Sequence, residues 1–129
     1  MDIVSALFCE YINLRQVPGP STRIDLTGIM FSLPAVSDPP VTMSPHLVVI
    51  IRCRPDEPGS AVLEVVFRDE HGDEVARNAS PFTVDPGKFT YRLVRGELTW
   101  SQYGTIEAHC RLDRSDAYTI VPLTLLPPA

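Results

Sequence analysis

The stretch AVLEVVFRD, residues 61–69, decides the fold class, because its side chains alternate with a period of two. Successive side chains of an extended strand point to opposite faces, so the alternation predicts a β-strand with one face in a core. The inward face is predicted to carry the apolar residues Ala61, Leu63, Val65 and Phe67. The outward face is predicted to carry Val62, Glu64, Val66 and Arg68.

The strand runs into DEHGDE, residues 69–74, where most side chains can bind a metal or move a proton. A second strand follows, so His71-Gly72-Asp73 is predicted to be the tip of a hairpin, with Gly72 supplying a positive φ. A metal site would require converging carboxylates, whereas neighbouring strand residues point to opposite faces, and the spacing of a calcium-binding EF-hand loop is absent. We therefore expect a polar turn, and neither a metal nor another cofactor.

The same pattern of strands and turns extends along the chain, and its 13 prolines lie mostly between apolar runs. Prolines placed there do not interrupt strand pairing. The turn-rich segment 34–45 is predicted to carry the chain from one sheet to the other. With 129 residues and 44% hydrophobic residues, the chain is expected to form one β-sandwich domain, 1–129. Strands are predicted at about 4–14, 23–32, 46–54, 61–69, 74–84, 88–95, 104–112 and 117–126.

Charge and composition exclude several classes of function. The formal net charge of −5 is unsuited to general nucleic-acid binding, which needs a clustered positive surplus. The amino-terminal stretch lacks the basic region of a secretory signal, and no apolar run approaches the roughly 20 residues that span a bilayer. Cys9, Cys53 and Cys110 are odd in number and far apart, which favours reduced thiols. We expect a cytoplasmic protein that binds neither nucleic acid nor membranes.

The three histidines are not accompanied by a catalytic motif. His46, His71 and His109 lie in different segments, and no nucleophile elbow, zinc-binding helix motif or phosphate-binding loop accompanies them. Cys110 follows His109 directly, but adjacent strand residues face opposite sides, so the imidazole cannot act as a base for the thiol. The sequence therefore predicts that the protein is not an enzyme and has no catalytic residues.

The carboxy-terminal part, residues 98–127, places Tyr103-Gly104 before a long alternating strand and a closing apolar strand. This order resembles the last two strands of immunoglobulin-like sandwiches. In that resemblance Tyr103 takes the place of an aromatic residue whose hydroxyl group anchors a corner of the sandwich by a hydrogen bond.

A wider resemblance covers nearly the whole chain. It is carried by ALFCEYINLR, HLVVIIRCR, VVFRDEHGDEV and YGTIEAHCRLD with the later VPLTLLP, which together resemble an uncharacterised family of small bacterial β-sandwich proteins. The resemblance implies an all-β fold, a single immunoglobulin-like β-sandwich of about seven to eight mostly antiparallel strands. It lends no activity, ligand or catalytic residue to this chain.

An all-β chain without a catalytic motif favours a non-catalytic protein-binding or assembly module that acts through a sheet face or an edge strand. If 61–69 and 104–112 share a sheet, polar side chains of both form one outward face, either solvated or in contact with a protein partner. The alternative function is a small enzyme or ligand-binding domain with a polar site around Glu107, His109 and Arg68. The predicted partner-contact face consists of Glu64, Arg68, Glu107, His109 and Arg111.

Strand 46–54 is apolar on both faces, which is typical of a strand buried on both. If 61–69 is its hairpin partner, apolar outward side chains of the two strands form one patch. Its cover comes either from 4–14 or 34–45 of the same chain, or from a second copy around a two-fold axis. The second solution predicts a homodimer. The predicted oligomer interface consists of Val48, Ile50, Val62 and Val66.

Overall fold

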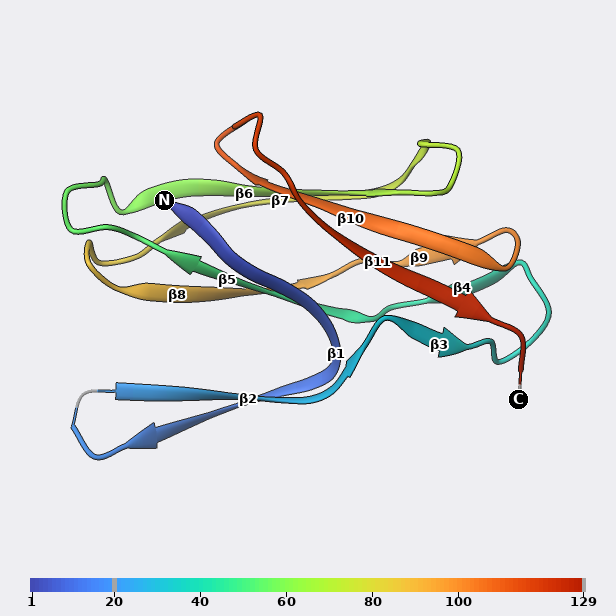
Figure 1. The fold of residues 1–129 in the computed structure, drawn as a ribbon, viewed down its shortest axis with the longest axis horizontal. Coiled ribbons are helices and arrows are strands. Elements are labelled where there is room, and N and C mark those ends of the chain that lie inside the picture. Colours follow the sequence, from blue (N-terminus) through green and yellow to red (C-terminus); the bar gives the residue numbers. More distant parts are fainter. Residues whose placement is uncertain (20, 129) are drawn as a thin grey trace.

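The computed structural model describes residues 1–19 and 21–128, whose regular structure consists of β-strands (Figure 1). The all-β sandwich predicted from the sequence is confirmed, and the three-residue strands β3, β4 and β9 are additions to it. None of the described residues belongs to a helix that could cross a membrane. The strands are β1 (Asp2–Val17), β2 (Ser21–Met30), β3 (Ser32–Pro34), β4 (Val41–Met43), β5 (His46–Arg52), β6 (Ser60–Arg68), β7 (Glu74–Thr83), β8 (Phe89–Arg95), β9 (Leu98–Trp100), β10 (Gly104–Leu112) and β11 (Thr119–Leu126).

The long strands form two sheets. Sheet A has the strand order β2-β1-β5-β8, sheet B has the order β3-β11-β10-β6-β7, and β4 pairs with β9 as a small ribbon. The pairs are antiparallel except for β11 with β3, which is parallel. The turn-rich segment 34–45 contains β4 and carries the chain from β3 in sheet B to β5 in sheet A.

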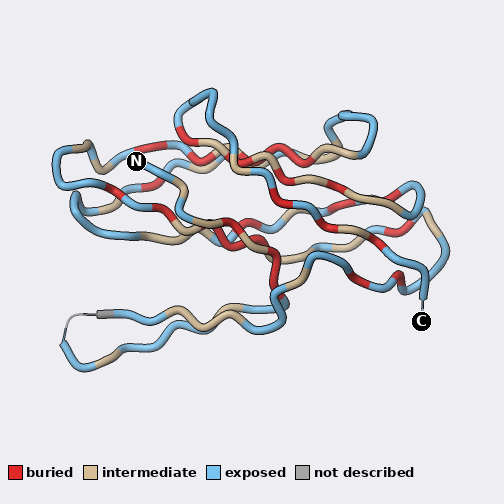
Figure 2. Tube along the Cα trace, viewed as in Figure 1, coloured by how far each residue is buried: buried red, intermediate tan, exposed pale blue. Residues whose placement is uncertain are grey.

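The core lies between the two sheets, and Figure 2 shows most of the buried residues on the strands of these sheets. The alternation in 61–69 gives the inward face correctly, because Ala61, Leu63, Val65 and Phe67 are all buried in this core. Sheet A contributes Phe8, Leu47, Val49 and Ile51 from the opposite side. Side chains from both sheets thus bury one shared apolar volume, which defines a β-sandwich.

The expected hairpin between 46–54 and 61–69 is wrong. β5 pairs with β1 and β8 in sheet A, whereas β6 pairs with β10 and β7 in sheet B, so residues 53–59 cross between the sheets. Val48 and Ile50 therefore lie on the outer face of sheet A, and Val62 and Val66 on the outer face of sheet B. Alternation reports which face a side chain takes, but not which strand lies beside it.

The first hairpin extends beyond the sandwich. β5 pairs with β1 only as far as Cys9, and from there β1 continues with β2 alone. We call the described part of 10–28 the arm. At its root Gly28 has a φ of 65°, and the side chain of Glu10 occupies the space where a Cβ atom would lie. Only glycine suits that position, and there the arm turns back beneath β5 and β8, on the side of sheet A away from sheet B (Figure 1).

Candidate binding cleft

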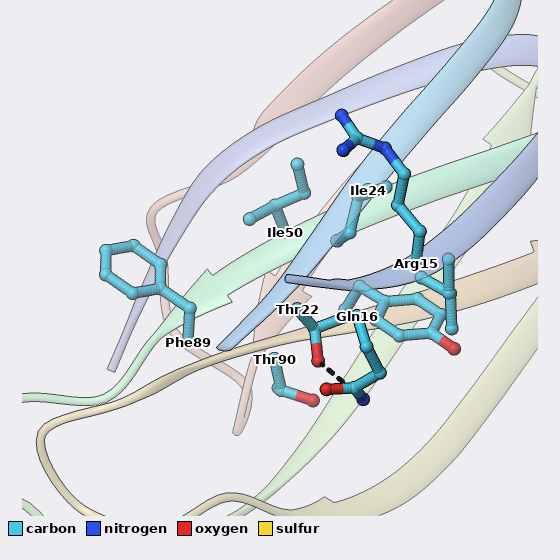
Figure 3. Close-up of a pocket in the computed structure, with 9 residues that line it drawn as sticks. Arg15, Gln16, Thr22, Ile24, Ile50, Phe89 and Thr90 are labelled. Atoms are coloured by element: carbon cyan, nitrogen blue, oxygen red, sulfur yellow. Dashed lines mark hydrogen bonds between the residues drawn. The ribbon is translucent and has the colours of Figure 1, made fainter. Parts of the chain in front are cut away.

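A cleft of about 410 Å³ lies between the arm and the outer face of sheet A (Figure 3). This volume lies within the range of ligand-binding pockets, roughly 300–1,000 Å³. Its two walls come from strands that are distant from each other in the sequence. The arm supplies Leu14, Arg15, Gln16, Thr22 and Ile24, and sheet A supplies Ile50, Phe89, Thr90 and Tyr91.

The strand registers explain why the walls are apolar. In the arm Leu14 lies directly opposite Ile24, and in sheet A Ile50 lies directly opposite Tyr91. Directly opposite residues of an antiparallel pair point to the same face, so each wall presents a pair of large apolar side chains. At the tip of the arm the Gln16 amide lies 3.4 Å from the Thr22 hydroxyl and adds a polar group to the wall (Figure 3).

Several large apolar side chains at the cleft remain open to solvent. Phe89 is 62% exposed, Leu14 is 44% exposed, and Leu93, two residues beyond Tyr91 on the same face of β8, is 42% exposed. Contiguous exposed apolar area on a protein generally marks an interaction site. The open cleft is therefore the strongest candidate for a binding site in this part of the molecule.

The four residues of the predicted oligomer interface are not brought together. Val48 and Val66 are 1% and 3% exposed in the single chain, so their cover lies within the chain itself. Ile50 is half-buried in the wall of the cleft, and Val62 is 40% exposed on the opposite sheet. A single apolar patch made of these four residues does not exist, because they occupy two different sheets.

The root of the arm is held by a histidine. The carbonyl oxygen of Glu10 lies 2.7 Å from Nδ1 of His46, so Nδ1 carries the hydrogen and donates. The Arg95 guanidinium contacts Nε2, which therefore accepts, as a neutral imidazole requires. Main chain of β1 is thus tied to the first residue of β5 at the point where the two strands separate.

An ion pair joins the two strands of the arm. Nε of Arg15 donates to Asp25 Oδ2 at 2.6 Å, and Nη2 donates to Oδ1 at 3.2 Å. This hydrogen bonding lowers the pKa of the Asp25 carboxyl and raises the pKa of Arg15. Both side chains are largely exposed, so the pair fixes the arm's geometry more than it stabilises the fold.

The predicted partner-contact residues lie together on the outer face of sheet B. β6 and β10 are neighbours there, with Arg68 opposite Glu107 and Glu64 opposite Arg111. Arg111 donates from Nε to Glu64 Oε1 at 2.9 Å, and these side chains are only 21% and 18% exposed. His109 Nε2 lies 3.3 Å from Glu107 Oε1. The face therefore carries the cross-strand ion pair of Glu64 with Arg111 and, along β10 itself, the contact of His109 with Glu107.

A depression of about 350 Å³ on this face gathers the three residues of the alternative site, Glu107, His109 and Arg68. Glu70 and Thr105 line it too, and sequence reasoning did not include them. The Glu107 side chain is 47% exposed, so water reaches the carboxylate directly.

In the acidic turn at 69–74 the Asp69 carboxylate accepts from the main chain of the turn itself. Oδ1 of Asp69 accepts hydrogen bonds from the N–H groups of His71 at 2.9 Å and Asp73 at 3.0 Å. Gly72 at the hairpin tip has a φ of 82°, as predicted. Across residues 1–19 and 21–128, no three His, Cys, Asp or Glu side chains are grouped so that they could hold a metal ion.

The three cysteines and Tyr103 contribute to packing and to side-chain contacts of the fold. Cys9, Cys53 and Cys110 are buried free thiols. Burial raises the pKa of Cys110 to about 12 and also raises that of Cys9, which suppresses thiolate formation. The Tyr103 hydroxyl donates to Asp38 Oδ1 at 3.4 Å, so it anchors the crossover segment by a side-chain contact.

Comparison with known proteins supports the fold. No protein-family model and no curated protein matches the chain. Among solved structures, a member of glycosyl hydrolase family 2 from Bacteroides cellulosilyticus DSM 14838 is similar, with a TM-score of 0.57 and 16% sequence identity. The match covers 69% of this chain and 14% of that chain, so this chain corresponds to a small part of the hydrolase. At this identity the likeness shows the fold alone, and the chain is a β-sandwich protein.

Proposed function

We propose that this protein is a non-catalytic binding or assembly module, and that its contact surface is the cleft between the arm and sheet A. The observation that carries the proposal is the exposure of Leu14 and Phe89 on the two facing walls. Burying such side chains against a partner gains about 25 cal/mol for each Å² of apolar surface removed from water. The cleft offers contact area of this kind on both walls.

Two further features support a module of this type. The arm is fixed at its root by His46 and along its length by the Arg15–Asp25 pair, so the cleft is held open before a partner arrives. A preformed site binds more tightly because less conformational entropy is lost on binding. The similar sandwich in the glycosyl hydrolase makes up 14% of a larger chain, which fits a fold that works as one part of an assembly.

The test is selection of random linear peptides, displayed on phage, against the purified protein. We expect peptides whose affinity falls at least about tenfold, or 1.4 kcal/mol, when Leu14→Asp and Phe89→Asp are combined. Ile120→Asp is the matched control, because Ile120 is 50% exposed on the outer face of sheet B. If no recovered peptide distinguishes the cleft variant from the wild type, the proposed function is wrong.

A second candidate function is supported by the depression on sheet B, which gathers Arg68, Glu107 and His109. It would make the protein a small enzyme or a binder of polar ligands. NMR chemical-shift mapping tests this second function. The protein is titrated in solution with a panel of small anionic and sugar ligands. Shifts confined to β6 and β10 that vanish in His109→Ala would favour this function over the cleft.

A further inference from the structure

We propose that the cleft receives an extended, uncharged segment of another protein, with apolar side chains at alternate positions, and that the segment pairs through its backbone with the open edge of β8. The inference rests on the proposed function and specifies the form of the partner at the same site. Three properties of the cleft lead to this inference. Unpaired strand edges border the cleft, the cleft extends to these edges, and its lining carries little charge.

Two stretches of strand backbone border the cleft without a partner strand among the described residues. β8 pairs with β5 on one side only. β1 pairs with β5 only from Asp2 to Cys9, so its continuation in the arm has β2 on one side and no strand on the other. Unpaired N–H and C=O groups of an edge strand are a template for adding another strand.

The cleft extends to both of these edges. Phe89, Thr90 and Tyr91 are consecutive, and all three line it. Neighbouring strand residues point to opposite faces, so a cavity lined by three in a row borders the main chain of that strand as well as its side chains. Leu14, Arg15 and Gln16 show the same relation on the arm. An occupant therefore meets main-chain groups as well as the apolar walls.

Charge complementarity defines the composition of the occupant. Arg15 is the charged residue among those lining the cleft, and both of its contacts with Asp25 are already made. A charged side chain brought between these walls would lose its hydration without gaining a free partner, which is costly. A strand with alternate apolar side chains fits both requirements, because it packs against Ile24 and Ile50 while its backbone bonds to the edge.

The probe is the tightest peptide recovered from the phage selection, made together with two analogues. One analogue is N-methylated at the odd-numbered amides and the other at the even-numbered amides. Each analogue therefore keeps all side chains but loses the N–H donors along one edge of the peptide. We expect at least one analogue to bind about tenfold or more weakly than the parent peptide. If both analogues bind like the parent, side chains alone hold the peptide and strand addition is overturned, while the proposed function stands.

Amide hydrogen exchange locates the added strand. On binding, amides within Phe89–Arg95 should become protected, whereas those of β7, an edge strand of sheet B, should not change. Protection of β7 in place of β8 would overturn the assignment. Sedimentation of the protein alone tests whether the occupant is a second copy of this chain. If the wild type is a dimer that Leu14→Asp dissociates, and if it binds no peptide, a second copy is the occupant and the inference is overturned.

Discussion

Oε1 of Glu70 accepts a hydrogen bond of 2.8 Å from the main-chain N–H of Thr105 and so fastens the β6–β7 turn to the start of β10. The contact depends on Gly104, the residue directly before Thr105. A Cβ atom at that position would lie 2.7 Å from the same Glu70 oxygen. An acidic side chain that suggests metal binding in the sequence thus serves as an acceptor for a strand end.

Replacing Glu70 with alanine should lower the free energy of unfolding by about 1–2 kcal/mol, because the Thr105 N–H loses its partner. Urea denaturation measures the change. His71→Ala in the same turn is the control and should stay within about 0.5 kcal/mol of the wild type, since His71 bonds to Asp69 through its main-chain N–H, which alanine keeps. Equal losses in the two variants would contradict a specific role for Glu70.

Replacing Arg15 with glutamine should raise the pKa of Asp25 towards its ordinary value, because the hydrogen bonds from the guanidinium hold it low. A carboxyl with a lowered folded-state pKa stabilises the fold above its unfolded pKa of about 3.9, and this contribution disappears as the pH falls further. NMR titration of the Asp25 carboxyl measures the shift. Arg54→Gln, which removes a pair with Asp2, should leave Asp25 unchanged.

Raising the pH should destabilise the protein through Cys110. Its folded-state pKa is raised to about 12, so the unfolded chain releases this proton first as the pH passes about 8.5. Stability is therefore fully present below that pH and declines between it and about 12. In Cys110→Ala the decline should be shallower by up to about 1.4 kcal/mol per pH unit. Parallel alkaline denaturation curves for the two proteins would show that this thiol does not contribute.

Replacing Val48 with threonine should cost about 1–3 kcal/mol, because the hydroxyl group enters a site that is 1% exposed. The same change at Val62, which is 40% exposed, should stay within about 0.5 kcal/mol. Thermal unfolding of the two variants tests the pair. Equal effects would contradict the placement of these residues on different sheets with different cover.

The sequence predicted the positions of the strands better than the order in which the strands pair within the sheets. Period-two alternation identified the inward face of β6 because its polar residues, Glu64 and Arg68, both fall on the face opposite Leu63 and Val65. It could not show that residues 53–59 cross between sheets, because a short polar connection is compatible with a hairpin or a crossover. The hairpin partner of β5 was therefore assigned to the wrong sheet.

The cleft could not be predicted from sequence patterns, for a related reason. In β8 the larger side chains Phe89, Tyr91 and Leu93 share one face, and such a face is ordinarily the one turned to the core. Here it is Val94 that is buried in the core, while Phe89 is exposed. The bend at Gly28 brings the arm opposite this face, and a single glycine in a strand pattern does not reveal the direction of a bend.

The chain's repeated passage between sheets A and B has a consequence for how the molecule forms. Sheet A is incomplete until β8 has been made, and in sheet B the early strand β3 must wait for β11, the last strand of all. Five of the eight pairings among the described strands thus close long loops. Folds of this kind reach the native state in milliseconds to seconds, far more slowly than helical bundles. During synthesis the apolar strands of the first half emerge before their neighbours exist, so the nascent chain is most exposed to aggregation while its carboxy-terminal strands are still being made.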